Sequence, residues 1–307
     1  MRQIKRLSIL MLVVVCFSAA RCKKTVTGPT PVKILSPLTQ AILDSTQLIS
    51  QVFRDTIFQV ADGVKETDIQ YLSMKGYAMR VFILAVDLNN PKLSLEGVLP
   101  YGETQLSSLM QPLPEMASYV DSAGHRVVGA VNADFFDRST AVPRGILVID
   151  GNILKTTWYN DRSATFIGVF KDGSPFIGTR QDFDSLKTKF TYALGSGPLL
   201  VDHHELQLQT DLTTEPRTAA GLTDDEVMYF VVVDGRNFYW SNGMTLTEMG
   251  ELLRACGSER AVNLDGGGSS TFLIRNPLAP VLQVRNMPSD GSNRPLGDGW
   301  MVISNQP

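Results

Sequence analysis

Residues 261–271 have the sequence Ala261-Val262-Asn263-Leu264-Asp265-Gly266-Gly267-Gly268-Ser269-Ser270-Thr271. The apolar beginning predicts a buried strand that stops at Asp265. Glycine loses more backbone entropy on folding than any other residue, so three glycines at a strand end indicate that a ligand or another backbone comes very close. The segment offers a carboxylate, backbone N–H groups that could form an anion nest, and hydroxyls at one point. A plain glycine-rich turn after an aspartate is the alternative.

The same stretch excludes two common motifs. The Gly-x-x-x-x-Gly-Lys-Ser/Thr spacing of a P-loop is absent, and no lysine is near to meet phosphates. A nucleophile elbow is also excluded, because Gly267-x-Ser269 is not followed by x-Gly. Residues 130–134 repeat the pattern Ala-Val-Asn-x-Asp of residues 261–265. Two equivalent strand ends could therefore meet across a pseudo-symmetric cleft, with chance similarity as the alternative.

Further motifs occur along the chain in a fixed order. They are Asn132-Ala133-Asp134-Phe135-Phe136, Pro143-Arg144-Gly145, Gly195-Ser196-Gly197-Pro198-Leu199-Leu200, Arg217-Thr218-Ala219, Val233-Asp234-Gly235-Arg236, Thr245-Leu246-Thr247-Glu248, the glycine triplet, Pro288-Ser289-Asp290-Gly291 and Arg294-Pro295. In this order they resemble the phosphodiester glycosidase domain family, from about Tyr77 to the C-terminus. The sequence departs from the family at Ala133-Asp134, where glycine is usual, and this adds a carboxylate.

The N-terminus has the features of an export signal. Basic residues precede a 14-residue apolar stretch, Leu7 to Ala20, which is too short to span a bilayer comfortably. Cys22 then predicts a lipoprotein signal over residues 1–22, with Cys22 as the acylated residue. Arg21 fits that pattern poorly, so plain secretion with cleavage near Ala20 is the alternative. We expect a cell-envelope lipoprotein, periplasmic or surface-exposed, that meets the membrane only through its lipid anchor.

Composition and spacing predict the organisation of the rest. Residues 23–40 form a tether rich in Thr, Pro, Lys and Ser, 41–76 form an N-terminal extension, and 77–307 form the phosphodiester glycosidase domain. The alternating residues 48–60 predict a strand or hairpin, as a lid or added edge. The net charge of −3 and the lack of a basic stripe argue against a nucleic-acid partner. No protein partner is evident.

Several elements of the domain have clear local signals. Apolar runs at 79–88, 127–131 and 227–233 predict buried strands, and residues 146–154 predict a hairpin turning at Asp150-Gly151. A short helix is predicted at residues 114–120 and a longer one at residues 245–255. Thr245-x-x-Glu248 is a capping-box pattern, so Glu248 has both a structural and a functional interpretation. We expect an α+β fold with a mixed β-sheet core and few helices, with two pseudo-equivalent halves as a further possibility.

The resemblance implies cleavage of the sugar C1–O bond of a glycosyl phosphodiester. The phosphate monoester that leaves has a second pKa near ~6, so it is a good leaving group and needs little help from a general acid. The harder tasks are to stabilise an oxocarbenium-like sugar and to activate water. Carboxylates suit those tasks, and arginine binds phosphate bidentately. The catalytic candidates are Asp265, Asp134, Asp234 and Glu248. The substrate-binding candidates are Asn132, Arg144, Arg217, Arg236, Asn263, Gly266, Gly267, Gly268, Ser269 and Arg294.

Other reactive side chains have simpler interpretations. His203-His204 fall where a hairpin turn is expected, and few histidines are present, so neither a Ser-His-Asp triad nor a His-rich zinc site is predicted. Cys256 would be the one cysteine left in a mature domain, so no intramolecular disulfide is expected. It falls on the apolar face of a predicted helix, which favours a small buried side chain over a nucleophile. We expect no metal and no cofactor. Phe135-Phe136 could stack on a sugar face, with core packing as the alternative.

The sequence therefore predicts a hydrolase of a phosphodiester-linked glycan, with N-acetylglucosamine as the expected sugar and Asp265, Asn263, the glycine triplet, Arg217 and Arg236 lining one cleft. Two alternatives stay open. The first is a non-catalytic surface lipoprotein that only binds glycans, and the second is a hydrolase of another cell-envelope polymer. Clustered carboxylates and arginines favour an enzyme, whereas exposed aromatic side chains would favour a binding protein.

Overall fold

The computed structural model describes residues 34–158 and 164–305, and the chain from Leu35 onward forms one compact unit. The expected signal at 1–22, with Cys22, and residues 23–33 of the expected tether lie outside the described residues. The remaining part of that tether is folded, because the first helix begins at Pro37. Ser36 caps this helix by accepting a hydrogen bond from the Thr39 amide at 3.2 Å, and the Asp55 carboxylate accepts one from the Ser36 amide.

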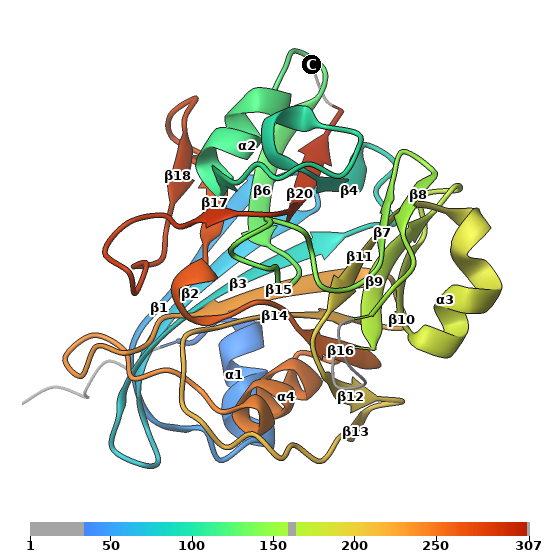
Figure 1. Cartoon of the computed structure of the whole chain (residues 1–307). Helices are drawn as coiled ribbons and strands as arrows, with labels where there is room; N and C mark the ends of the chain where they lie inside the picture. The colour runs from blue at the N-terminus through green and yellow to red at the C-terminus, as the bar shows by residue number, and fades with distance from the viewer. Residues whose placement is uncertain (1–33, 159–163, 306–307) are drawn as a thin grey trace, which may run out of the picture. The chain divides into compact units, whose positions relative to one another are not determined.

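The described chain folds into helices and many short strands (Figure 1). The helices are α1 (Pro37–Ser45), α2 (Leu113–Val120), α3 (Arg180–Leu186) and α4 (Leu246–Ala255). The strands of the first half are β1 (Ile49–Ala61), β2 (Val64–Ser73), β3 (Ala78–Asp87), β4 (Leu93–Val98), β5 (Gln111–Pro112), β6 (Arg126–Asn132), β7 (Leu147–Ile149) and β8 (Asn152–Lys155). Those of the second half are β9 (Thr165–Phe170), β10 (Pro175–Thr179), β11 (Phe190–Ser196), β12 (Leu199–Asp202), β13 (Glu205–Leu206), β14 (Arg217–Leu222), β15 (Val227–Val233), β16 (Arg260–Asn263), β17 (Phe272–Arg275), β18 (Leu282–Val284), β19 (Pro295–Leu296) and β20 (Gly299–Ser304).

The strands form one large sheet and three smaller ones. The large sheet has eight strands in the order β1-β2-β3-β15-β14-β16-β12-β13. One five-stranded sheet has the order β18-β17-β6-β20-β4, the other has the order β10-β9-β11-β7-β8, and β19 pairs with β5. The strands β6 and β16, which carry the repeated Ala-Val-Asn-x-Asp pattern, thus belong to different sheets.

Apolar side chains on both faces of the large sheet create the layered packing. On one face, residues such as Phe82 and Leu84 of β3 pack against side chains of the two five-stranded sheets, including Leu194 and Trp300. On the other face, α1 and α4 cover the sheet, with Met249 of α4 fully buried (Figure 1). A further cluster packs α2 against its own five-stranded sheet, and another packs Phe183 of α3 against β9 and β11. The structure therefore places helices on the outer faces and two sheet faces against each other.

The expected α+β fold with a β-sheet core and few helices is confirmed. Within the described residues every strand pairing is antiparallel, so the pairing is more uniform than in the expected mixed sheet. Many strands pair with the next strand along the chain, to which a short turn joins them. The predicted strand at 79–88, the hairpin at 146–154 and the helix at 245–255 correspond to β3, β7–β8 and α4. The alternating residues 48–60 form β1, at the edge of the large sheet. No described helix has both the length and the apolar character needed to cross a bilayer.

Candidate active site

The two repeated strand ends contact each other directly. The Asp265 amide donates to the carbonyl of Ala133 at 2.9 Å, and Asn132 Nδ2 donates to the carbonyl of Asp265 at 2.5 Å. Asn132 Oδ1 also accepts bonds from Thr218 Oγ1 at 2.9 Å and from the Thr271 amide at 3.0 Å. Because Asn132 is almost fully buried, these bonds make it a connection between the sheets, and not a side chain that reaches a ligand. The structure therefore brings Asp134 and Asp265 together.

Asp134 lies in a space that two glycines leave open. Its Oδ2 accepts a hydrogen bond from the Gly145 amide at 2.6 Å, while its Oδ1 is buried without a hydrogen-bond partner among the described residues. A Cβ on Gly195 would lie 2.6 Å from Asp134 Oδ2, and a Cβ on Gly145 would lie 2.9 Å from the same oxygen. Burial raises the pKa of Asp134 to about 7, against the opposing effect of the Gly145 and Phe135 amides.

Asp265 lies among cations and donors at the end of β16. Burial raises its pKa to about 6, and a hydrogen bond from Ser269, the charge of Arg294 and the charge of Arg144 act in the opposite direction. Arg294 is itself held in place, because its Nη1 donates to Ser269 Oγ at 3.0 Å and its Nη2 lies 2.7 Å from a carboxylate oxygen of Asp290. Arginine charges and hydrogen-bond donors thus favour the ionised form of Asp265, whereas burial opposes it.

Asp298 is a third buried acid in this cluster, and it was not among the predicted site residues. Its Oδ1 accepts a hydrogen bond from the Asp134 amide at 2.9 Å. Burial and the charges of Asp134 and Asp265 raise its pKa well above the ordinary value. The only sequence signal is an aspartate between two glycines before the apolar run of residues 300–303. Asp134, Asp265 and Asp298 are defined here as the acid cluster.

Lys155 is a second functional candidate that the sequence did not indicate. Its Nζ donates to the carbonyls of Arg144, Gly145 and Thr157 at 2.7 to 2.8 Å. These bonds fix the segment that supplies both the Gly145 amide and the Arg144 guanidinium to the acid cluster. Its positive charge also lowers the pKa of Asp134, while burial lowers the pKa of Lys155 itself.

The glycine triplet is shaped by its own hydrogen bonds. The amide of Gly267 donates to the carbonyl of Pro216, and the amides of Ser269 and Ser270 donate to Gly266 and Gly267. These three amides therefore do not contribute to the expected anion nest, because the Pro216 carbonyl accepts from Gly267 and the short 3₁₀ turn at Gly267–Ser269 uses the amides of Ser269 and Ser270. The glycines instead admit neighbours: a Cβ on Gly268 would lie 2.1 Å from Arg294 Nη2. This close approach places the Arg294 guanidinium directly against the triplet.

The Arg236 guanidinium and the backbone of Arg217 also lie next to the triplet. A Cβ on Gly267 would lie 3.1 Å from Arg236 Nη2, and a Cβ on Gly266 would lie 3.7 Å from the Cα of Arg217. Arg236 Nε donates to Glu215 at 2.6 Å. Arg217 Nε and Nη2 donate to the carbonyls of Met244 and Thr213. Both arginines therefore lie at the triplet but already have protein partners.

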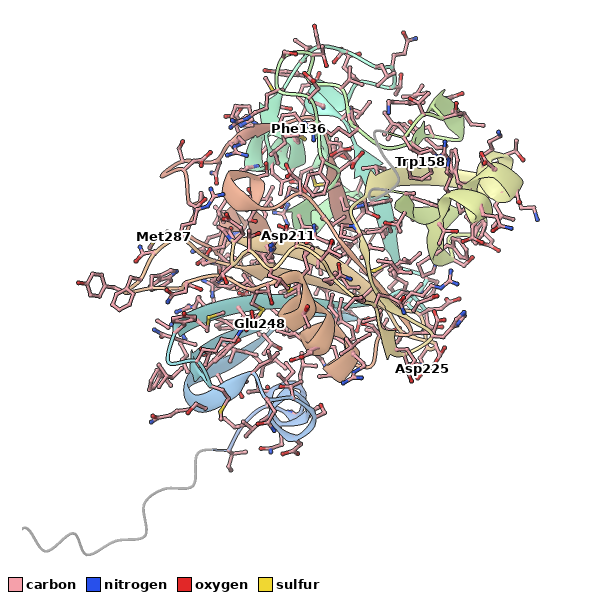
Figure 2. All side chains as sticks on the ribbon, turned by 60° about the horizontal axis from the view of Figure 1, so that its bottom comes forward. Phe136, Trp158, Asp211, Asp225, Glu248 and Met287 are labelled. Carbon is pink, nitrogen blue, oxygen red and sulfur yellow. The ribbon has the colours of Figure 1, made fainter. Side chains whose placement is uncertain are left out.

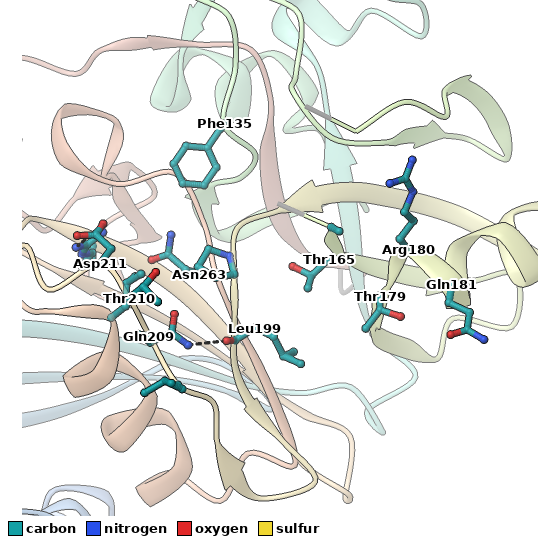
Figure 3. A pocket seen from close by; sticks show the side chains of 15 residues that line it. Phe135, Thr165, Thr179, Arg180, Gln181, Leu199, Gln209, Thr210, Asp211 and Asn263 are labelled. Atoms are coloured by element: carbon teal, nitrogen blue, oxygen red, sulfur yellow. Dashed lines mark hydrogen bonds and ion pairs between the residues drawn. The ribbon is translucent and has the colours of Figure 1, made fainter. Parts of the chain in front are cut away.

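A groove of about 660 Å³ opens next to the acid cluster (Figure 3). Figure 3 shows Phe135 and Asn263 at its middle, with Asp211 on one side and Arg180 on the other. Asn263 Nδ2 donates to the carbonyl of Leu264 at 2.6 Å, whereas its Oδ1 is buried without a hydrogen-bond partner in the described part of the chain. The groove also includes Arg217 in its lining, but among the described residues it includes neither Asp265 nor Arg236. The expected single cleft is thus divided into a groove and an adjoining acid cluster.

Two of the four catalytic candidates lie in different surroundings. Asp234 accepts hydrogen bonds from Trp240 Nε1 at 2.7 Å, from the Met287 amide at 2.9 Å and from Asn286 Nδ2 at 3.3 Å. Burial raises its pKa to about 6, although these donors act against the shift. These contacts make Asp234 the anchor of the loop that contains Met287.

Glu248 lies at the start of α4, well apart from Met287 in the view of Figure 2. Its carboxylate accepts a bond from the Thr245 amide at 2.9 Å, and the Thr245 hydroxyl accepts one from the Glu248 amide, which is the predicted capping box. Lys75 Nζ lies 2.8 Å from the other carboxylate oxygen. The structural interpretation of Glu248 accounts for all these contacts.

The histidine pair forms the predicted turn between β12 and β13. Both His203 and His204 have positive φ angles, 49° and 64°, and are largely exposed. Asp202, His203 and Glu259 offer three ligand atoms within 4.8 Å of one another, the one such group in the described residues. Arg260 Nε lies 3.0 Å from Asp202 Oδ1, so a guanidinium already balances the negative charge there. This arrangement does not resemble a built metal site.

Comparisons with known proteins agree with this architecture. A family model described as phosphodiester glycosidase matches residues 125–303. N-acetylglucosamine-1-phosphodiester alpha-N-acetylglucosaminidase of Mus musculus is 28% identical over 178 residues, which are 51% of this chain and 33% of that protein. The SPbeta prophage-derived uncharacterized protein YomE of Bacillus subtilis (strain 168) is 28% identical over 178 residues, 58% of this chain and 22% of that protein. The chain thus spans about a third or less of the length of these curated relatives.

Solved structures share the fold. A hypothetical protein from Synechocystis matches with a TM-score of 0.61 at 13% identity, over 82% of this chain and 64% of that one. The zebrafish N-acetylglucosamine-1-phosphodiester alpha-N-acetylglucosaminidase catalytic domain, auto-inhibited by its pro-peptide, matches with a TM-score of 0.58 at 19% identity, over 84% of this chain and 86% of that one. Since the family model covers more than half of the chain, the chain belongs to the phosphodiester glycosidase family.

Proposed function

We propose that this protein is a hydrolase that cleaves the sugar C1–O bond of a glycosyl phosphodiester in a glycan, with alpha-N-acetylglucosamine as the sugar. The acid cluster is the observation that carries the proposal. It joins two acids of raised pKa, Asp265 and Asp134, to the charges of Arg144 and Arg294 beside a groove of about 660 Å³. Family membership supports the reaction class.

The different surroundings of the two acids suggest their roles. Asp265, with a pKa of about 6 and two nearby arginines, is the ionised group that supports the developing positive charge on the sugar and activates water or attacks C1. Asp134, with a pKa of about 7, holds a proton for part of the time near neutral pH and is the proton donor or acceptor. The leaving phosphate needs little help from an acid, so the arginines contribute mainly by binding its negative charge.

The groove beside the acid cluster fits the sugar end of such a substrate. Phe135 and Asn263 both belong to its lining, and the buried Asn263 Oδ1 has no hydrogen-bond partner in the described part of the chain. Thr165 Oγ1 lies 2.7 Å from Ser196 Oγ and adds a further polar group. A cleft with an apolar ring and a few placed polar atoms is typical of small-ligand sites.

A second candidate function is glycan binding without catalysis. Phe238 and Tyr239 are 72% and 91% exposed and lie next to Arg236 in the chain, with ring centroids 5.3 Å apart. Exposed aromatic rings of this kind are a feature that a glycan-binding protein would use. The acid cluster favours the enzyme, because burying the carboxyl groups of Asp134 and Asp298 costs free energy that a binding surface does not require.

The deciding experiment compares the parent with Asp265→Asn and Arg294→Ala on an alpha-N-acetylglucosamine-1-phosphodiester, with released sugar and calorimetric binding measured. Asp265→Asn should lower kcat by ~10²–10⁴-fold and keep or improve binding, since a carboxylate near an anionic substrate opposes binding. Arg294→Ala should weaken binding first. Asp172→Asn, in the exposed β9–β10 turn, is the matched control and should change neither. A parent that binds but releases no sugar would favour glycan binding alone.

We also propose that the protein is exported and anchored at the cell envelope through Cys22. The basic n-region, the apolar stretch Leu7 to Ala20 and the cysteine that follows support this localisation, whereas Arg21 is the residue that fits it least. Secretion with cleavage near Ala20 is the competing proposal. The natural substrate would in either case be a glycan outside the cytoplasm.

A further inference from the structure

Asp298 occupies a position that the backbone forces into the interior. It lies between Gly297 and Gly299, immediately before β20, and is 1% exposed. A Cβ on Gly297 would lie 2.6 Å from the Ala141 carbonyl oxygen, and a Cβ on Gly299 would lie 2.6 Å from Leu113 Cδ1. The two glycines thus allow close packing on both sides of Asp298. Its carboxyl group is buried there, beside Asp134.

The hydrogen bonds of Asp298 are incomplete. Its Oδ1 accepts a bond from the Asp134 amide at 2.9 Å, while its Oδ2 is buried without a hydrogen-bond partner among the described residues. Asp134 Oδ1 is buried and without a hydrogen-bond partner in the same way. An ionised carboxylate can only accept hydrogen bonds, whereas a protonated carboxyl group also donates one. A proton on one of these two oxygens therefore removes the charge of a buried carboxylate oxygen to which no described group donates.

The charges around the cluster decide which acid keeps that proton. The charged groups that act on Asp298 are the carboxyls of Asp134 and Asp265, and both oppose its ionisation. Asp134 instead has Lys155 nearby, and Asp265 has Arg144 and Arg294. Acids that are buried close together do not all ionise, and the proton stays where no cation compensates the charge.

We propose that Asp298 is a positioning residue that stays protonated at neutral pH on its buried, partnerless Oδ2 and fixes Asp134 by accepting its amide hydrogen bond at Oδ1. Asp298 then adds no charge beside the two reacting acids. Asp265 carries the negative charge, and the proton that exchanges during the reaction belongs to Asp134. The catalytic part of this proposal rests on the proposed function; the protonation state does not.

The protonation state can be measured without a substrate. Burial raises the pKa of Asp134 to about 7 and that of Asp265 to about 6, so both are mostly ionised at pH about 8.5. At that pH the infrared spectrum of the parent should contain the carbonyl stretch of a protonated carboxyl group, and Asp298→Asn should lack it. The Asp172→Asn variant should retain the band. Identical spectra of parent and Asp298→Asn would overturn the proposal, whatever reaction the protein catalyses.

The kinetic test uses the fact that an amide resembles a protonated carboxyl group in shape and hydrogen bonding. Asp298→Asn should keep kcat within the same order of magnitude, with an unchanged pH profile near neutral pH. The same change at Asp134 should lower kcat by ~10²–10⁴-fold. Asp298→Ala, which removes the acceptor of the Asp134 amide, should lower kcat and stability together. A loss in Asp298→Asn as large as that in Asp134→Asn would show that Asp298 works as a carboxylate and would overturn the proposal.

Discussion

Asn132 joins parts of the chain that are far apart in sequence. Its side chain contacts Asp265, Thr218 and Thr271, up to 139 residues away, and each of its bonded atoms is buried. A sugar hydroxyl would have to displace one of these bonds and leave a buried group unpaired. At the scale of residues, the two asparagines of the repeated pattern therefore differ: Asn132 holds the structure together, and Asn263 lines the groove and keeps a buried Oδ1 without a hydrogen-bond partner among the described residues.

Burial of Asp134 makes stability depend on pH in a direction opposite to that of a surface aspartate. Its folded-state pKa of about 7 lies above the ordinary value of 3.8, so the folded protein binds more protons between these values. The free energy of unfolding should therefore fall as the pH rises through this window. In Asp134→Asn this part of the dependence should disappear, as measured by urea denaturation at pH 5 and pH 8. An unchanged pH dependence in the variant would contradict the assigned environment.

At the scale of elements, two glycines decide the position of the acid cluster. Gly195 ends β11 next to Ser196, and Gly145 precedes β7; these two backbones approach so closely that a Cβ on either would lie 2.6 Å from the Cα of the other. Gly195 belongs to the motif Gly195-Ser196-Gly197, which resembles the family. A glycine is needed at position 195 because the Asp134 carboxylate occupies the space that a side chain would fill.

Gly195→Ala tests this explanation. The added Cβ would lie 2.6 Å from Asp134 Oδ2, so the carboxylate should move and turnover should fall, with a stability loss of about 1–3 kcal/mol from overpacking. Released sugar per folded molecule and a thermal melt are the two measurements. Gly173→Ala is the control: its φ of +92° strains an alanine, but nothing lies within 4 Å of the added Cβ, so only stability should fall. Equal turnover in both variants would refute the explanation.

At the scale of the whole molecule, buried charges connect the N-terminal hairpin to the sheet. Asp68 on β2 and Arg80 on β3 approach to 2.6 Å, and Arg285 Nε lies 2.9 Å from the buried Glu66. Arg80 also lies over the Trp240 ring, 4.8 Å from its centroid, and Trp240 donates to Asp234. The β1–β2 hairpin, which lies before the part matched by the family model, is thus packed into the same unit as the active site.

The proposed anchor is tested on the whole chain in cells. Cys22→Ser should leave the protein unacylated and move it from the membrane to the soluble fraction. Each acyl methylene contributes ~0.8 kcal/mol of membrane affinity, so the loss of the chains should be decisive. Fractionation and the mass of the mature N-terminus are the measurements, with Cys256→Ser as the matched control. A variant that fractionates like the parent, with a mature N-terminus near Ala20, would support simple secretion.

The sequence by itself determined the elements with strong local signals. The β7–β8 hairpin follows from Asp150-Gly151, whose φ angles are both positive, and α4 follows from its apolar spacing and its capping box. It also identified Asp265 and Asp134 as strand-end carboxylates, because a buried strand that stops at an acid is a local pattern. The repeated pattern offered contact between the two strand ends as one of two alternatives, with chance similarity as the other.

Only the tertiary structure decided which polar groups share surroundings. It added Asp298 to the acid cluster and placed Lys155 beside it, and it placed Asp234 and Glu248 among partners that explain them structurally. It also showed that the amides of Gly267, Ser269 and Ser270 donate to protein carbonyls. The physical reason is that burial, charge compensation and hydrogen-bond satisfaction depend on groups that lie more than a hundred residues apart, and no local pattern contains their distances.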